Sequence, residues 1–206
     1  MSHHAAINPV SMRRMICLIV VSLCMYVPNA TSQNSWGATV SYGVGELKSL
    51  DSKTMAHITS WGLSYEIGLR QRYGLSFGLR RGSIRTNQLM ADNSVFVTDQ
   101  FVELVIGGRR YYPLSNLSTL YGGVQVNGRL MYNRDVETSG SDQSFSNIGS
   151  TYGIGAFAGI RTVVSPKTSL DITLGENYDF AKSFKKSEHE FRINQVYLNV
   201  GMQISL

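Results

Sequence analysis

The amino-acid sequence predicts an all-β fold, namely a transmembrane, eight-stranded, antiparallel, up-and-down β-barrel preceded by a cleaved signal peptide. Three observations predict it. Eight segments alternate between apolar and polar or small residues, the connections between them alternate in length, and charged residues are almost absent from the apolar columns. Because the hydrophobicity is divided between alternate positions, the mean hydropathy of the chain is only -0.08.

The N-terminal segment has the three parts of a secretory signal peptide. Arg13 and Arg14 precede an uncharged run over residues 15–27, and Ala30-Thr31-Ser32 supplies a small-x-small cleavage site. A run of 13 residues is too short for a membrane anchor. We therefore predict cleavage after Ser32, with cleavage after Ala30 as the alternative.

The predicted cleavage gives two parts, a signal peptide over residues 1–32 and a β-barrel over residues 33–206. Removing two arginines from 19 basic residues leaves 17 against 14 acidic residues, a mild net charge of +3. Both cysteines, Cys17 and Cys24, lie in the first part. The remainder therefore has no cysteine for disulfides or thiolate chemistry.

Eight segments of the remaining chain have the period of two that is typical of strands with two different environments. They are residues 36–45, 58–70, 75–84, 97–112, 120–132, 151–164, 170–180 and 195–206. In the last segment the even-numbered positions are all apolar, whereas the odd-numbered positions include Gln195, Asn199 and Gln203. Amides opposite an unbroken apolar column favour lipid outside and a polar lumen inside.

The connections follow a short–long rhythm. The short ones are residues 71–74, 113–119 and 165–169, and the long ones are residues 46–57, 85–96, 133–150 and 181–191. A barrel with short periplasmic turns and long outer loops requires this rhythm, and an even number of strands puts both chain ends on the short-turn side. Aromatic residues near segment ends, among them Trp61, Tyr111 and Tyr132, are predicted to form an interfacial girdle.

Charged residues are distributed unequally between the outward and inward columns. Glu176 is the one charged residue in the outward columns, with Arg81 and Arg110 just past the segment ends. The inward columns hold nearly equal numbers of acids and bases, which are candidates for ion pairs that fill the lumen of a narrow eight-stranded barrel. These residues are Glu66, Arg70, Arg80, Glu103, Arg109, Arg129, Arg161, Asp171 and Asp179.

Few residues suggest catalysis or ligand binding. The predicted mature chain has two histidines, His57 with Ser60 nearby and His189, and both fall in predicted outer loops. Neither has the spacing of a metal site, so we expect no metal and no cofactor, and we assign no catalytic residue. Gly153-x-Gly155 lies inside a strand pattern, which predicts relief of crowding in the lumen and not a phosphate loop.

Three lysines make the last predicted loop basic, and lipopolysaccharide phosphates would attract them. They are Lys182, Lys185 and Lys186. A solvated loop is the simpler interpretation. No basic-aromatic array suggests nucleic acid, and no 18-residue apolar run follows the N-terminus, which excludes a helical membrane protein.

The signal peptide, the eight alternating segments and the terminal strand resemble the small eight-stranded outer-membrane β-barrel family. The resemblance implies the outer membrane of Gram-negative bacteria, with outer-membrane lipid, lipopolysaccharide and the barrel assembly machinery as partners. In that family the machinery reads the terminal strand, so the implied assembly signal is Val200, Met202, Ile204 and Leu206. Family members usually end in phenylalanine, which makes the terminal leucine a departure.

We therefore expect a porin-like barrel without enzymatic activity, with a structural or interaction role through four extracellular loops and a lumen plugged by paired charges. The sequence does not identify an extracellular protein partner. One alternative is a lipid A or phospholipid-modifying enzyme at the outer rim. Another is a soluble secreted calycin-like barrel that binds a ligand in its cavity.

Overall fold

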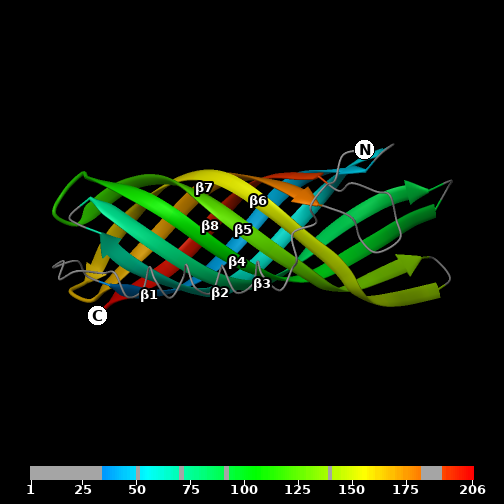
Figure 1. The fold of residues 1–206 in the computed structure, drawn as a ribbon, viewed down its shortest axis with the longest axis horizontal. Helices are drawn as coiled ribbons and strands as arrows, with labels where there is room; N and C mark the ends of the chain where they lie inside the picture. Colours follow the sequence, from blue (N-terminus) through cyan, green and yellow to red (C-terminus); the bar gives the residue numbers. More distant parts are fainter. Residues whose placement is uncertain (1–33, 50–51, 70–71, 91–92, 139–140, 182–191) are drawn as a thin grey trace, which may run out of the picture. The chain divides into compact units, whose positions relative to one another are not determined.

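A computed structural model describes residues 34–49, 52–69, 72–90, 93–138, 141–181 and 192–206, which form a sheet of eight antiparallel strands (Figure 1). The strands are β1 (Ser35–Ser49), β2 (Ser52–Leu69), β3 (Tyr73–Met90), β4 (Asn93–Pro113), β5 (Ser118–Thr138), β6 (Ser141–Ser165), β7 (Thr168–Ala181) and β8 (Arg192–Ser205). Each strand pairs with its neighbours in the chain, and β1 also pairs with β8. The predicted eight-stranded up-and-down barrel is confirmed, whereas the predicted signal peptide lies outside the described residues.

The pairing of β1 with β8 closes the sheet, and further backbone hydrogen bonds fasten the end of β8. The Ser205 amide donates to the Lys167 carbonyl at 2.9 Å, and the Leu206 amide donates to the Asn34 carbonyl at 2.9 Å. No helix among the described residues has the length and apolar character needed to cross a bilayer.

The predicted alternation is visible in the burial of successive side chains. Along β7, Asp171 and Thr173 are buried inside the barrel, whereas Ile172 and Leu174 are exposed on the outside. Large apolar side chains cover the exterior on all eight strands, as Val40, which is 65% exposed, illustrates. A continuous apolar exterior of this kind is unfavourable in water and favourable in hydrocarbon.

Three of the four predicted long loops are instead continuations of the strands. Residues 46–57, 85–96 and 133–150 lie mostly in paired strands, with only residues 50–51, 91–92 and 139–140 between the described parts. We call these paired ends of β1–β6 the hairpin extensions, and Figure 1 shows them at the end of the barrel opposite the C-terminus. The prediction was wrong because Ser, Asp and Asn are common in loops. Their backbone amide and carbonyl groups form hydrogen bonds equally well in a pair of strands.

A β-bulge marks where the β5–β6 extension begins. The register of β5 shifts between Met131 and Asn133 in its pairing with β6, and the same two residues of β5 lie opposite the consecutive Phe101 and Gln100 of β4. A one-residue shift reverses which side chains face inward. As a result Arg134, which shares the parity of the outward Leu130, is hydrogen-bonded to the buried Asp99.

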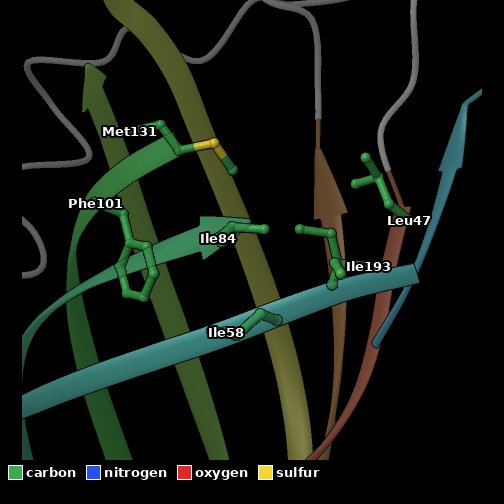
Figure 2. Close-up of a cluster of buried hydrophobic side chains, with 7 residues drawn as sticks. Leu47, Ile58, Ile84, Phe101, Met131 and Ile193 are labelled. Atoms are coloured by element: carbon green, nitrogen blue, oxygen red, sulfur yellow. The ribbon is translucent and has the colours of Figure 1, made fainter. Parts of the chain in front are cut away.

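The interior is not polar throughout, which differs from the predicted polar lumen. Seven buried side chains form an apolar layer at the base of the hairpin extensions, and Figure 2 shows them converging from the surrounding strands. They are Leu47, Ala56, Ile58, Ile84, Phe101, Met131 and Ile193. Along β4 the interior order is Asp99, then Phe101 of this layer, then Glu103, so the apolar layer separates two polar regions.

We expect Val200→Arg to lower the free energy of unfolding in lipid vesicles by about 2–4 kcal/mol, because it places a cation among outward apolar side chains. Its register partners on the exterior, Val40 and Ile172, are both exposed. Denaturant titration followed by tryptophan fluorescence measures the change, and Val200→Leu is the control. An arginine tolerated as well as leucine at this position would contradict a lipid-facing exterior.

Candidate functional site

The first group of interior charges lies near the short-turn end and consists of Glu66 on β2, Arg109 on β4, Arg161 on β6 and Asp171 on β7; we call it the turn-end cluster. Arg161 Nη2 lies 2.8 Å from Glu66 Oε2 and 2.8 Å from Asp171 Oδ2. Arg109 Nη1 lies 3.3 Å and 3.4 Å from the same two oxygens. Two guanidinium groups therefore balance two carboxylates.

Two tyrosines complete the turn-end cluster. The hydroxyl of Tyr111 donates to Glu66, and that of Tyr121 donates to Asp171. The guanidinium carbon of Arg109 lies 5.0 Å from the centre of the Tyr121 ring, and that of Arg161 lies 5.3 Å from the Tyr111 ring. Tyr111 was predicted in the exterior girdle, but its side chain faces inward because it shares the odd-numbered column of β4 with the buried Glu103.

The central cluster lies deeper along the strands and consists of Arg80 on β3, Glu103 on β4, Asn127 and Arg129 on β5, and Asp179 on β7. Arg129 donates to Glu103 and to Asp179, each at 2.8 Å. Arg80 lies 3.5 Å from the second Glu103 oxygen, and the Asn127 amide donates to both acids at 3.2 and 3.0 Å. The side chain of Arg129 is 1% exposed, so its charge depends on these partners.

Glycines make room for the interior side chains. A Cβ at Gly153 would collide with Asp179, and one at Gly155 would collide with Asn177. On the same strand, a Cβ at Gly159 would collide with the ring of Tyr121. The glycines of β6 thus relieve crowding at three levels of the interior, as the sequence pattern predicts for two of them.

The turn-end cluster connects opposite walls of the barrel. In a ring of eight strands, β2 and β6 are four strands apart in either direction. The Glu66–Arg161 pair joins these two strands at 2.8 Å. Side chains from opposite walls therefore meet across the interior.

The structure also contains an ion pair that the sequence analysis missed. Arg134 on β5 donates to both Asp99 oxygens at 2.6 and 2.8 Å, beyond the apolar layer. The bulge before Arg134 brings it inward, and no feature of the alternation alone reveals a bulge. Asp99 and the inward Glu103 are both odd-numbered residues of β4. This shared parity was the sequence signal that could have placed Asp99 in the interior.

Among the predicted lumen residues, eight have interior side chains that take part in the turn-end or central cluster. These are Glu66, Arg80, Glu103, Arg109, Arg129, Arg161, Asp171 and Asp179. Arg70 lies outside the described residues. The predicted assembly-signal residues Val200, Met202, Ile204 and Leu206 are exposed on the exterior face at the end of the chain.

The candidate catalytic fragment around His57 is not assembled. His57 faces outward, where its Nδ1 lies 2.9 Å from the Tyr42 hydroxyl, whereas Ser60 is buried on the interior side. The wall of the barrel therefore separates the two side chains. His189 and the three lysines of residues 182–186 lie outside the described residues. No group of three or more His, Cys, Asp or Glu within the described ranges could hold a metal ion.

Comparison with known proteins identifies both a family and similar folds. The family model described as outer membrane protein beta-barrel domain matches residues 15–203. The outer membrane protein OprG from Pseudomonas aeruginosa is similar in structure, with a TM-score of 0.57, 12% identity, and coverage of 86% of this chain and 96% of that chain. Neisserial surface protein A (NspA) has a TM-score of 0.53 and 13% identity over 83% of this chain and 97% of that chain. No curated protein matches the sequence.

We expect Arg129→Ala to destabilise the barrel by about 3–5 kcal/mol, because Glu103 and Asp179 would remain buried without their shared cation. Denaturant unfolding in vesicles measures this change. Combining Arg129→Met with Asp179→Asn should recover most of the loss, because Glu103 then remains paired with Arg80. Arg134→Ala, at a site where the side chain is 26% exposed, is the control and should have a smaller effect. Equal losses for the two single variants would contradict a dominant role for the central cluster.

Proposed function

The chain belongs to the outer membrane protein beta-barrel domain family, and on that premise we propose that it is a non-enzymatic barrel with a structural or interaction role, whose lumen is closed by paired charges. It is a porin-like β-barrel protein of the bacterial outer membrane. The soluble calycin-like alternative is therefore wrong.

The proposed orientation places the chain ends and short turns on the periplasmic side. Ser35 at the start of β1 pairs with Ser205 at the end of β8, so both ends of the barrel domain lie with the short connections. The hairpin extensions then project outside the cell, as is general for outer-membrane barrels. In this orientation the exposed column of β8 is also available to the barrel assembly machinery during insertion.

The observation that carries the proposed closure is the Glu66–Arg161 pair across the interior. Side chains that meet from β2 and β6 cross the interior at that level, which supports the proposed closure. Above it, the central cluster and the apolar layer contain further buried side chains, of which Arg129 and Phe101 are in contact, with 4.5 Å between guanidinium carbon and ring centre. Eight strands enclose a space that side chains can fill. These features support a barrel that is not a general diffusion pore.

An interaction role is supported by the hairpin extensions. The β5–β6 extension exposes a row of polar side chains around Phe145, which is itself 49% exposed. Side-chain hydrogen bonds join the two strands of this extension. Asp135 on β5 accepts hydrogen bonds from Ser144 on β6 at 2.9 Å and from Asn133 on β5 at 3.1 Å. An ordered ribbon with an exposed aromatic residue suits contact with an extracellular protein.

The enzymatic alternative has less support. A lipid-modifying enzyme needs its nucleophile and base on one side of the wall and within hydrogen-bonding reach. His57 and Ser60 are on opposite sides.

If the lumen is closed, the purified protein in planar bilayers should conduct no steady ionic current. Replacing both members of the cross-barrel pair with alanine, Glu66→Ala with Arg161→Ala, should increase conductance because it removes the side chains that cross the interior between β2 and β6. Val200→Leu on the exterior is the matched control. A wild-type conductance of general-porin size would contradict closure.

If the barrel is not an enzyme, cells that carry His57→Ala or His189→Ala should have the same lipid A and phospholipid species as wild-type cells. Mass spectrometry of extracted lipids measures this, with a strain that lacks the protein as the control. A lipid species that requires the wild-type histidine would refute the non-enzymatic assignment.

A further inference from the structure

We propose that the exterior of β2–β4 binds the phosphate groups of an outer-leaflet glycolipid, the lipid A part of lipopolysaccharide, with Arg81 and Arg85 as the cationic residues. The inference rests on the proposed orientation, in which the hairpin extensions face outside. It concerns the lipid-facing wall and is independent of whether the lumen conducts.

The exterior of these strands changes from apolar to polar over a short distance. The row of Leu63, Leu79 and Leu104 is exposed and apolar, and Leu79 pairs in register with the other two. The next outward residue of β3 is Arg81, which is paired with Trp61. The two outward positions of β3 that follow Arg81 extend the exterior wall by four residues. At about 3.3 Å per residue, this is roughly 13 Å. This distance is suited to the passage from hydrocarbon to head groups.

The two rows that follow Arg81 are polar on all three strands. Ser83 is paired with Thr59 and Gln100, and Arg85 is paired with His57 and Thr98. Trp61 and Tyr132 beside the first row have the amphipathic rings that gather at membrane interfaces. The described wall therefore presents two arginines and several hydroxyl or amide groups at the level of the lipid head groups.

A hollow of ≈ 650 Å³ on this wall makes room for a ligand group. Its lining includes Arg81, Trp61, Thr59, Ser83, Thr98 and Gln100. The hydroxyls of Thr59 and Ser83 lie 3.1 Å apart and point to the exterior. Hydroxyl donors beside a guanidinium are the groups that bind phosphate oxygens.

Arg81 is oriented but its charge is not neutralised by an acid. Its Nε donates to the Tyr132 hydroxyl at 3.1 Å, and that hydroxyl donates to Gln100 Oε1 at 3.1 Å. This arrangement fixes the guanidinium plane while both terminal nitrogens have no carboxylate partner among the described residues. A fixed guanidinium fork suits bidentate contact with phosphate.

Arg85 likewise has no acid in salt-bridge range within the described part of the chain, and its guanidinium carbon lies 5.7 Å from the Phe96 ring centre. The nearest exterior acid in register is Asp135, two strands away, which already accepts hydrogen bonds from Asn133 and Ser144. A second exterior hollow, of ≈ 630 Å³, is mainly apolar, and its charged lining residue is Glu176. Phosphate should therefore prefer the hollow beside Arg81.

The test measures binding of the detergent-extracted full-length protein to two purified lipids by native mass spectrometry. The lipids are lipid A with both phosphates and the same lipid A after enzymatic dephosphorylation. The wild-type protein should bind the phosphorylated form about thirtyfold more tightly, since two basic groups near an anionic surface contribute on that scale. Inorganic phosphate at millimolar concentration should not displace the lipid, because the acyl chains contribute to binding.

Arg81→Gln combined with Arg85→Gln should abolish the preference for the phosphorylated form. The matched control is Arg110→Gln, which removes an exterior arginine at the opposite end of the wall, stacked at 5.8 Å on Tyr73 and 5.1 Å on Tyr112. This control should retain the preference. Heat-modifiable gel migration verifies that each variant is folded.

Three results would overturn the proposal. They are equal binding of the two lipid A forms by the wild-type protein, a preference that survives in the double variant, and full displacement by inorganic phosphate. The first needs no variant, so misfolding cannot hide it. Proteolysis of intact cells tests the orientation separately, and conductance tests closure separately, so failure of either remains distinguishable from failure of this site.

Discussion

Backbone hydrogen bonding between the first and last strands is the interaction on which the rest of the structure depends. In hydrocarbon an unpaired edge strand has no water to satisfy its amide and carbonyl groups, so a spanning sheet must be closed. Here the closing ladder runs from Ser35 opposite Ser205 to Lys48 opposite Arg192. Closure assigns every second residue to lipid and its neighbours to a narrow interior. Both the apolar exterior and the paired charges follow from that assignment.

Inside such a narrow barrel, an ionic side chain has few ways to remain charged. The turn-end and central clusters solve this problem in the same way, with two arginines against two acids in each. Neutral donors add hydrogen bonds to the acids, from tyrosines in one cluster and from Asn127 in the other. Buried pairs of this kind strongly penalise the loss of any single member. The interior therefore behaves as a connected unit that joins walls far apart in sequence.

Much of this architecture can be predicted from the sequence because the alternation of apolar and polar residues indicates which face of the sheet each side chain occupies. The alternation gives eight strands and places Glu66, Arg129 and Asp171 inside, without any knowledge of their partners. It cannot give the partner of each charge, because Glu66 and Arg161 are 95 residues apart and meet only after closure. The alternation also gives wrong predictions where a bulge changes the parity of a strand or where strand residues are polar. The bulge at Met131 turns Arg134 inward, and the polar residues of the hairpin extensions resemble loops although they form strands.

The apolar layer has a consequence for the medium in which the protein can function. Dissolved ions weaken a charge pair only where they can approach it, and hydrocarbon side chains exclude them. Phe101, Met131 and Ile193 lie between the outer hairpins and Arg129, whose side chain is 1% exposed. The attraction among Arg129, Glu103 and Asp179 is thus shielded from ions that approach from the hairpin-extension end of the barrel. Its strength should therefore change little with the salt concentration at that end.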